Sequence, residues 1–371
     1  LVRSRGLGDV YKRQILGCAL AAVALSSCNN YDFEQNFYPH KVGLMAGTNR
    51  IYDRTTVELS AVENGTASVQ LVANLSGSQL ADRDYHVTIA HDDSLFNAYN
   101  KSNFDIDSTK FARLLPAECY EDPAMTATIP SGSNKCLFDI KLKNLGKLSP
   151  DSTYFLNYKI VSHDASEVAT DNNKLGGKLD HVLIKVTWKN AYGSTAENWN
   201  YQLVSSQVTN VETKSTTRPT NTVRAFPVAA NAVRFLAGDE KWDDYTKALH
   251  DINVKSIVAT IGSKTVTNPS AYNVTLKPFK QDSLEVEMLT PVGEYNNTFL
   301  LNELGGSAST NPTYFKEFRL HYRYRVMKNA KQNDGTWKAG PWKEVLSKLR
   351  YQYNPRAVSY THLRAHETVL D

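Results

Sequence analysis

Hydrophobic and polar side chains alternate along most of this chain, and this two-residue period constrains the fold more than any other feature. Alternation places every second side chain on one face of a strand, so each run predicts a half-buried antiparallel strand. Gly, Asn, Asp and Ser residues separate the runs, as expected of turns. We therefore predict an all-β fold. The runs in the first half are Val57 to Ala61, Val69 to Leu75, Tyr85 to Ile89, Tyr154 to Ile160 and Val182 to Trp188.

The first half is interrupted by one helical segment and ends in a change of composition. Asp92 to Asn100 begins with aspartates suited to N-capping, which predicts a short surface helix. After Trp188 the segment 189–197 is polar, small and without periodicity. We predict an Ig-like β-sandwich over residues 36–188 and a linker over 189–197.

The second half, residues 198–357, repeats the strand pattern with one helix. Trp242, Tyr245, Leu249 and Ile252 recur at helical spacing, which predicts an amphipathic helix over residues 241–252. We expect an antiparallel β-sandwich or a lipocalin-like barrel with this one short helix. The strands expected are 199–209, 222–228, 233–236, 254–261, 272–276, 284–289 and 315–326.

The last of these runs has a cationic face. Apolar side chains from Phe318 to Val326 alternate with Arg319, His321, Arg323 and Arg325. Such a face could bind an acidic sugar. More commonly it is solvated and paired with acids on the next strand, and we favour that interpretation.

The N-terminal region has the pattern of a bacterial lipoprotein signal. An apolar run begins at Ile15, ends in Leu25-Ser-Ser-Cys28 and gives way to polar residues. Residues 15–28 thus predict a signal with its lipobox, acylation of Cys28 and anchoring to a membrane. Asn29, in place of an aspartate, favours the outer membrane.

Both tails are foreign to this pattern. Ser4 to Gln14 and Val358 to Thr368 are translations of the two strands of one oligonucleotide that resembles a transposon-based sequencing adaptor. We therefore interpret residues 1–14 and 358–371 as adaptor artefacts. The tails carry net charges of +3 and −1, so the net charge of +4 becomes +2 without them. A chain so close to neutral gives no argument for a nucleic-acid partner.

Two cysteines remain once the signal is set aside. In an oxidising compartment Cys119 and Cys136 are candidates for a disulfide. The alternation from Cys136 to Leu142 directs Cys136 toward the core, which makes a buried free thiol the alternative. The sequence has no CxxC or His/Cys spacing, so we predict no metal and no cofactor.

Several segments together resemble a known family. Phe111 to Tyr120 (FARLLPAECY), Met125 to Gly132, Leu137 to Leu142 and Leu148 to Leu156 resemble a domain of unknown function in Bacteroidota lipoproteins. That domain also occurs N-terminal to family 18 glycoside hydrolases. The second half, with Phe318 to Tyr324 and Trp342 to Arg350, is similar to the uncharacterised C-terminal β domain that often follows it.

The resemblance implies a lipoprotein of the outer membrane, exposed at the cell surface, that binds glycans without cleaving them. Its expected role is polysaccharide or glycoprotein-glycan utilisation beside an outer-membrane glycan transporter complex. It also implies that little follows Ala357. Two alternatives are a structural or adhesin-type surface lipoprotein and the non-catalytic part of a truncated family 18 hydrolase.

Carbohydrate sites need aromatic faces that stack on sugar C–H surfaces and polar groups that orient hydroxyls. Trp242 and Tyr245 share a helical stripe with Leu249, which also suits a core position. Trp337 lies in a turn-rich segment, 332–340, where an exposed aromatic is expected. The candidates for carbohydrate binding are Trp337, Trp199, Trp242, Tyr245 and Trp342.

A catalytic role finds little support in the sequence. Asp105-Ile-Asp107 is the nearest approach to the clustered acids of family 18, but no glutamate follows in step and no alternation of strands and helices surrounds it. Nucleophile-elbow, phosphate-loop and zinc motifs are missing as well. We therefore predict that the chain is not an enzyme.

Overall fold

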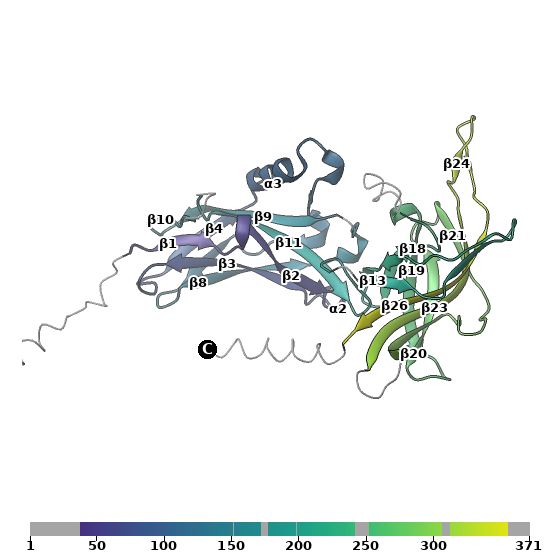
Figure 1. Cartoon of the computed structure of the whole chain (residues 1–371). Helices are drawn as coiled ribbons and strands as arrows, with labels where there is room; N and C mark the ends of the chain where they lie inside the picture. The colour runs from purple at the N-terminus through teal and green to yellow at the C-terminus, as the bar shows by residue number, and fades with distance from the viewer. Residues whose placement is uncertain are drawn as a thin grey trace, which may run out of the picture.

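The computed structural model describes residues 38–150, 152–171, 177–197, 199–241, 252–305 and 312–354. Figure 1 shows two β-rich domains in succession, the first in purple to teal and the second in green to yellow. The prediction of an all-β chain with two domains is confirmed. The adaptor segments, the signal with Cys28, and residues 242–251, with Trp242 and Tyr245, lie outside the described residues.

The N-terminal domain is a sandwich of two sheets. Its pairings are antiparallel except that β10, β2 and β5 run parallel to their partners β1, β11 and β9. The first sheet has the order β10 (Glu167–Val168), β1 (Lys41–Leu44), β3 (Ser68–Ser76), β8 (Lys135–Leu142) and β6 (Tyr120–Glu121). The second has the order β12 (Gly193–Ser194), β11 (His181–Asn190), β9 (Tyr154–His163), β4 (Tyr85–Ala90) and β7 (Thr126–Ile129), with β2 (Ile51–Glu58) beside β11 and β5 (Arg113–Leu114) beside β9.

The two-residue period explains how these sheets pack. Alternate residues of β3 and β8 are buried, and their inward side chains meet those of β9 and β11 in one core that includes Phe138, Tyr158 and Trp188. β11 is buried on both faces, because α3 (Ser94–Phe104) covers its outer side. Tyr99 of α3 packs edge-to-face on Phe155 at 5.0 Å.

The expected helix at 92–100 is present as α3, and Asp92 accepts a hydrogen bond from the Ser94 amide at 3.0 Å. The run from Val57 to Ala61 is not one strand, since β2 ends at Glu58 and α2 (Leu59–Glu63) follows. Three alternating positions are too few to separate a strand from a single helical turn. Four 3-10 turns complete the domain: η1 (Thr48–Arg50), η2 (Ser108–Lys110), η3 (Ala117–Cys119) and η4 (Leu145–Lys147).

Of the two alternatives for Cys119 and Cys136, a disulfide or buried free thiols, the structure has the buried free thiols. The register explains why. Tyr120, next to Cys119, pairs with Leu142, which lies six residues along β8 from Cys136. Six residues of strand span about 20 Å, far beyond the reach of a disulfide. Burial raises the pKa of each thiol to about 11.

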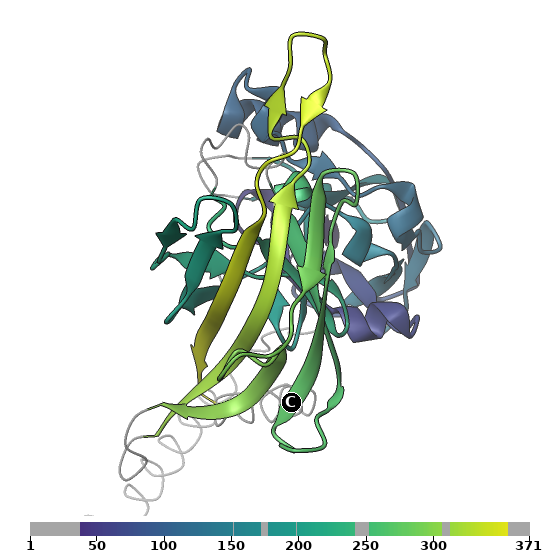
Figure 2. The same cartoon turned by 90° about the vertical axis from the view of Figure 1, so that its right-hand side faces the viewer.

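The C-terminal domain is one curled sheet (Figure 2). Phe235 of β18 contacts Phe318 of β23 at 5.9 Å, so strands far apart in the sheet face each other across one core. The main path is β15 (Thr216–Thr217), β14 (Gln207–Asn210), β26 (Lys343–Tyr353), β23 (Thr313–Val326), β22 (Thr298–Gly305), β20 (Ala271–Pro278), β19 (Ser256–Lys264), β18 (Ala232–Leu236) and β17 (Phe226–Ala229). Beside it lie β13 (Asn200–Leu203), β16 (Thr222–Arg224) and β21 (Leu284–Met288), and β24 (Ala330–Lys331) and β25 (Trp337–Lys338) form a separate hairpin.

The strand β23 pairs with three other strands of this domain. Its predicted apolar face is confirmed, because Phe318, Leu320, Tyr322 and Tyr324 are almost completely buried. One edge of β23 pairs with β26 along its length, and the other pairs first with β22 and then with β21. The strands β22 and β26 were not expected. In β22 apolar residues follow one another from Phe299 to Leu301 without alternation, and β26 places the polar Ser347 in its inward series.

The segment 189–197, predicted as a linker, is a hairpin that fastens the two domains together. β11 continues to Asn190, and β12 pairs back on it. The buried Asn190 side chain donates to the carbonyls of Ala229 and Ala232 at 2.7 and 2.9 Å. Trp188 Nε1 donates to the Pro227 carbonyl at 3.1 Å. The polar Asn190 side chain of this segment thus forms buried hydrogen bonds instead of facing solvent.

Candidate functional site

The cationic face of β23 is paired with acids, as the favoured interpretation predicted. Arg323 and Arg325 bind Glu287 and Glu285 of the neighbouring β21, with contacts of 2.5 and 2.6 Å. His321 Nε2 lies 2.9 Å from Glu344 of β26. The two Arg–Glu pairs are partly exposed, so they contribute little to stability, whereas the His321 side chain is only 6% exposed.

Trp342 lies on the same outer face, immediately before β26. Its ring packs against the guanidinium groups of Arg323 and Arg325, whose carbons lie 4.7 and 4.8 Å from the ring centre. The next residue, Lys343, points to the opposite side, where its ammonium binds Asp239 at 2.8 Å. Trp342 is therefore half-buried by cation–π packing.

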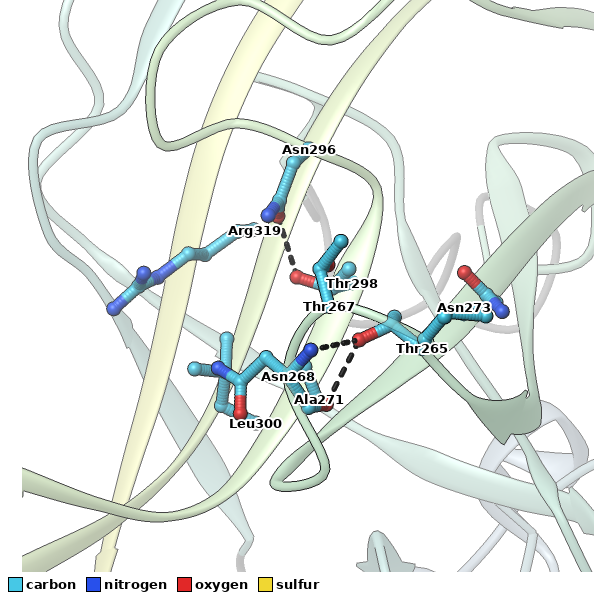
Figure 3. A pocket seen from close by; sticks show the side chains of 10 residues that line it. Thr265, Thr267, Asn268, Ala271, Asn273, Asn296, Thr298, Leu300 and Arg319 are labelled. Carbon is cyan, nitrogen blue, oxygen red and sulfur yellow. Dashed lines mark hydrogen bonds between the residues drawn. The ribbon is translucent and has the colours of Figure 1, made fainter.

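A cavity of about 390 Å³ opens on the outer face of β20, β22 and β23. Figure 3 shows its lining side chains, which come from these strands and from the loop after β19. Because Tyr272 and Phe299 face the core, their neighbours Ala271, Asn273 and Thr298 face the cavity. The lining residues are Thr265, Val266, Thr267, Asn268, Ala271, Asn273, Asn296, Thr298, Leu300 and Arg319.

The cavity is mainly a hydroxyl and amide surface. Thr265 Oγ1 donates to the Asn268 carbonyl at 2.8 Å and accepts from its amide at 3.2 Å, which shapes the loop. Thr298 Oγ1 donates to Asn296 Oδ1 at 2.5 Å (Figure 3). Of the ten lining residues, Arg319 alone is charged. A second hollow of about 500 Å³ between β2 and β3 is shallower.

Arg319 is fixed by a network of four charged side chains. Its Nε donates to Glu317 Oε1 at 2.5 Å, and its Nη2 donates to Glu303 Oε1 at 2.8 Å. Arg350 Nε donates to the other oxygen of Glu317 at 2.6 Å. Glu317 is 0% exposed. Although burial opposes the charge of Arg319, the hydrogen bonds to Glu317 and Glu303 raise its pKa.

The predicted aromatic residues do not converge. Trp337 is 50% exposed on the β24–β25 hairpin, which projects at the upper end of the domain in Figure 1. Trp342 lies at the same end of β26, whereas Trp199 stacks on Tyr351 near the other end, with ring centres 4.9 Å apart. Nine residues of strand separate Trp342 from Tyr351, about 30 Å. Trp199 also packs under the Lys316 ammonium at 4.6 Å, so packing accounts for its position.

Sequence reasoning missed a polar cluster in the N-terminal domain. His91 Nε2 lies 3.0 Å from Asp122 Oδ1, which also accepts from the Tyr158 hydroxyl at 2.7 Å. Burial, with this hydrogen bond, raises the pKa of Tyr158 and keeps it a donor. The cluster thus ties the segment after β6 to β4 and β9. Its members are far apart in the chain and share no motif, so no sequence signal could have found them.

The acids compared with family 18 have a local role. Asp107 Oδ1 accepts from the Thr109 amide at 3.2 Å and caps η2, and its other oxygen binds Lys110 at 2.9 Å. Among the described residues, His, Cys, Asp and Glu side chains do not gather in threes as a metal site would require. Within the same ranges, no helix has the length and apolar character needed to span a membrane.

Comparison with known proteins finds a family model that matches each domain. Residues 38–167 match the profile of a family described as an N-terminal domain, and residues 180–355 match that of a family described as C-terminal. No curated protein matches the chain. The expected membership of two uncharacterised domain families is thus supported, whereas the lipoprotein character and the link to family 18 stay predictions.

Solved structures from Bacteroides share the fold. A Bacteroides ovatus protein of unknown function is 16% identical, with 84% of this chain and 94% of that chain covered and a TM-score of 0.58. A multidomain B. ovatus protein including DUF1735 is 17% identical, with the same coverage and a TM-score of 0.56. An auxiliary nutrient binding protein from Bacteroides thetaiotaomicron is 15% identical, with 82% and 92% covered and a TM-score of 0.51. The chain is thus similar to this N-terminal domain family over residues 38–167 and to this C-terminal domain family over residues 180–355.

Proposed function

We propose that this protein is a non-catalytic glycan-binding lipoprotein, anchored in the outer membrane through Cys28 and serving polysaccharide or glycoprotein-glycan utilisation. The observation that carries the proposal is the cavity on the outer face of β20, β22 and β23. Its volume of about 390 Å³ lies in the range of small-ligand sites.

The chemistry of the cavity suits sugar hydroxyls. Each hydroxyl both donates and accepts, and Asn and Thr side chains offer both functions at short reach. Asn273, Asn296 and Thr298 supply such groups from strands and strand ends, while Thr267 and Asn268 supply them from the loop. The lining has no pair of carboxylates of the kind that hydrolyses glycosidic bonds, which favours binding over cleavage.

Two further observations support the proposal. A structural neighbour is named as an auxiliary nutrient binding protein. The half-exposed Trp337 offers a flat apolar face at the other end of the domain, where it could stack on a second part of a long glycan. An anchor at Cys28 would leave the C-terminal domain free to bind, because the N-terminal domain lies between them.

Glycan-array binding by residues 29–357 tests the proposal, with Asn273→Ala as the site variant. Asn273 is exposed at the cavity, so its truncation should leave the fold intact. Loss of one hydrogen bond, about 1 kcal/mol, predicts about fivefold weaker binding. Asn103→Ala, on α3 of the other domain, is the matched control and should bind like the unmodified chain. Absence of binding to every glycan would contradict the proposal and favour a structural or adhesin role.

A further inference from the structure

We propose that the cavity selects neutral sugars over anionic ones, and that Glu303 sets this selectivity by holding Arg319. This inference rests on the proposed function, because it names the class of glycan that the same cavity would accept. Arg319 supplies the one positive charge among the lining residues. Whether it acts as an anion receptor therefore decides which sugars fit.

The donors of Arg319 already face two carboxylates. Nε is directed at Glu317 and Nη2 at Glu303, at 2.5 and 2.8 Å. Arg319 is 17% exposed and Glu303 32% exposed, so the Glu303 carboxylate is partly open to solvent where it contacts Arg319, a residue of the cavity lining. A uronate or sialate bound at Arg319 would approach this carboxylate and be repelled by it.

The surrounding charges are compensated as well. Arg319 contacts two glutamates, Glu303 and Glu317, and Arg350 supplies the second positive charge, so two arginines and two glutamates balance. Lys348, which pairs with Arg319 across β23 and β26, is the next cation on this face. Its ammonium binds Glu294 at 2.5 Å. No uncompensated cation among these groups is available to attract an anionic sugar.

A neutral sugar meets no such penalty. Glu303 and Glu317 hold the Arg319 guanidinium in one position, and the Asn and Thr side chains around it need no charge on the ligand to form hydrogen bonds. Arg319 thus has a fixed position in the cavity wall. Selectivity arises from the acid that neutralises it, which is a repulsive element against the wrong ligand.

The test compares neutral glycans with glycans that carry uronic or sialic acids, using the mature chain and Glu303→Gln. The variant keeps an oxygen acceptor near Arg319 but removes the charge. We expect the unmodified chain to bind neutral glycans, and Glu303→Gln to bind acidic glycans about tenfold more tightly than the unmodified chain does. That gain should shrink as salt is raised, while neutral binding should change less than twofold.

Glu285→Gln is the matched control, because it frees Arg325 on the same strand but away from the cavity, and it should gain nothing. Circular dichroism of both variants checks folding. Preference of the unmodified chain for acidic glycans, or a Glu303→Gln variant without the gain, would overturn the inference while glycan binding stands. Failure of every form to bind any glycan would instead refute the proposed function.

Discussion

Glu317 joins two arginines inside the C-terminal domain, and its replacement tests how that domain is held together. The carboxylate is 0% exposed and accepts from Arg319 and Arg350 through separate oxygens. The register places Glu317 directly opposite Arg350 on β26, and Arg319 lies two residues along β23 on the same face. Each cation therefore reaches the carboxylate without distorting the sheet.

Glu317→Gln leaves both guanidinium groups without this charge partner. Removing one member of a buried ion pair costs about 3–5 kcal/mol. Arg319 retains Glu303, and both arginines keep partial contact with water, so the lower end of that range applies. We expect the free energy of unfolding of the domain to fall by about 3 kcal/mol. Urea titration followed by circular dichroism and tryptophan fluorescence measures this change.

Glu285→Gln provides the comparison, because its partner Arg325 and the carboxylate are both substantially exposed. Its cost should be small, because exposed ion pairs are screened by water. The reasoning is refuted if Glu317→Gln costs no more than Glu285→Gln. In that case the four-membered network would not stabilise the sheet, and the fixed position of Arg319 would need another explanation.

Two further predictions concern the domain junction and the hairpin. Burial lowers the pKa of Lys316 from 10.5 to about 8, so between these pH values the folded state binds fewer protons than the unfolded state. The free energy of unfolding of the unmodified chain, relative to that of Lys316→Met, should therefore increase as pH rises from 8 to 10. Urea titrations at the two pH values measure this difference, and an equal difference at both would contradict the prediction. Trp337→Ala should leave the free energy of unfolding within about 0.5 kcal/mol, because the ring is half exposed. If Trp337 stacks on long glycans, calorimetry should show a loss of about 1 kcal/mol in binding, and equal affinities would exclude that contact.

The sequence predicts strands well where alternation is long and fails where it is short or broken. The inward face of β23 follows directly from its five alternating apolar residues. The run at Val57 to Ala61 is too short to show that the chain turns into α2. By composition Asn190 belongs to a polar linker, yet its side-chain amide is buried between the domains. Burial of a polar side chain depends on partners about 40 residues away, which no local pattern encodes.

The candidate site was less predictable than the fold. Arg319 was recognised on a cationic face, and its pairing with acids was the favoured interpretation. The acids are Glu303 on β22 and Glu317 on β23 itself, and the register that brings β22 to Arg319 is set by the sheet as a whole. The register between β20 and β22 likewise places Asn273 opposite Thr298 at the cavity. The chemistry of sugar binding favoured tryptophans as candidate site residues, whereas the cavity is lined mainly by Thr and Asn side chains.

Calorimetric titration of residues 29–357 with neutral polysaccharides identified on the array measures whether the cavity binds glycans. We expect saturable binding that weakens about fivefold in Asn273→Ala and is unchanged in Asn103→Ala. Equal affinities for Asn273→Ala and the unmodified chain, or heats no greater than those of dilution for every neutral glycan, would contradict it.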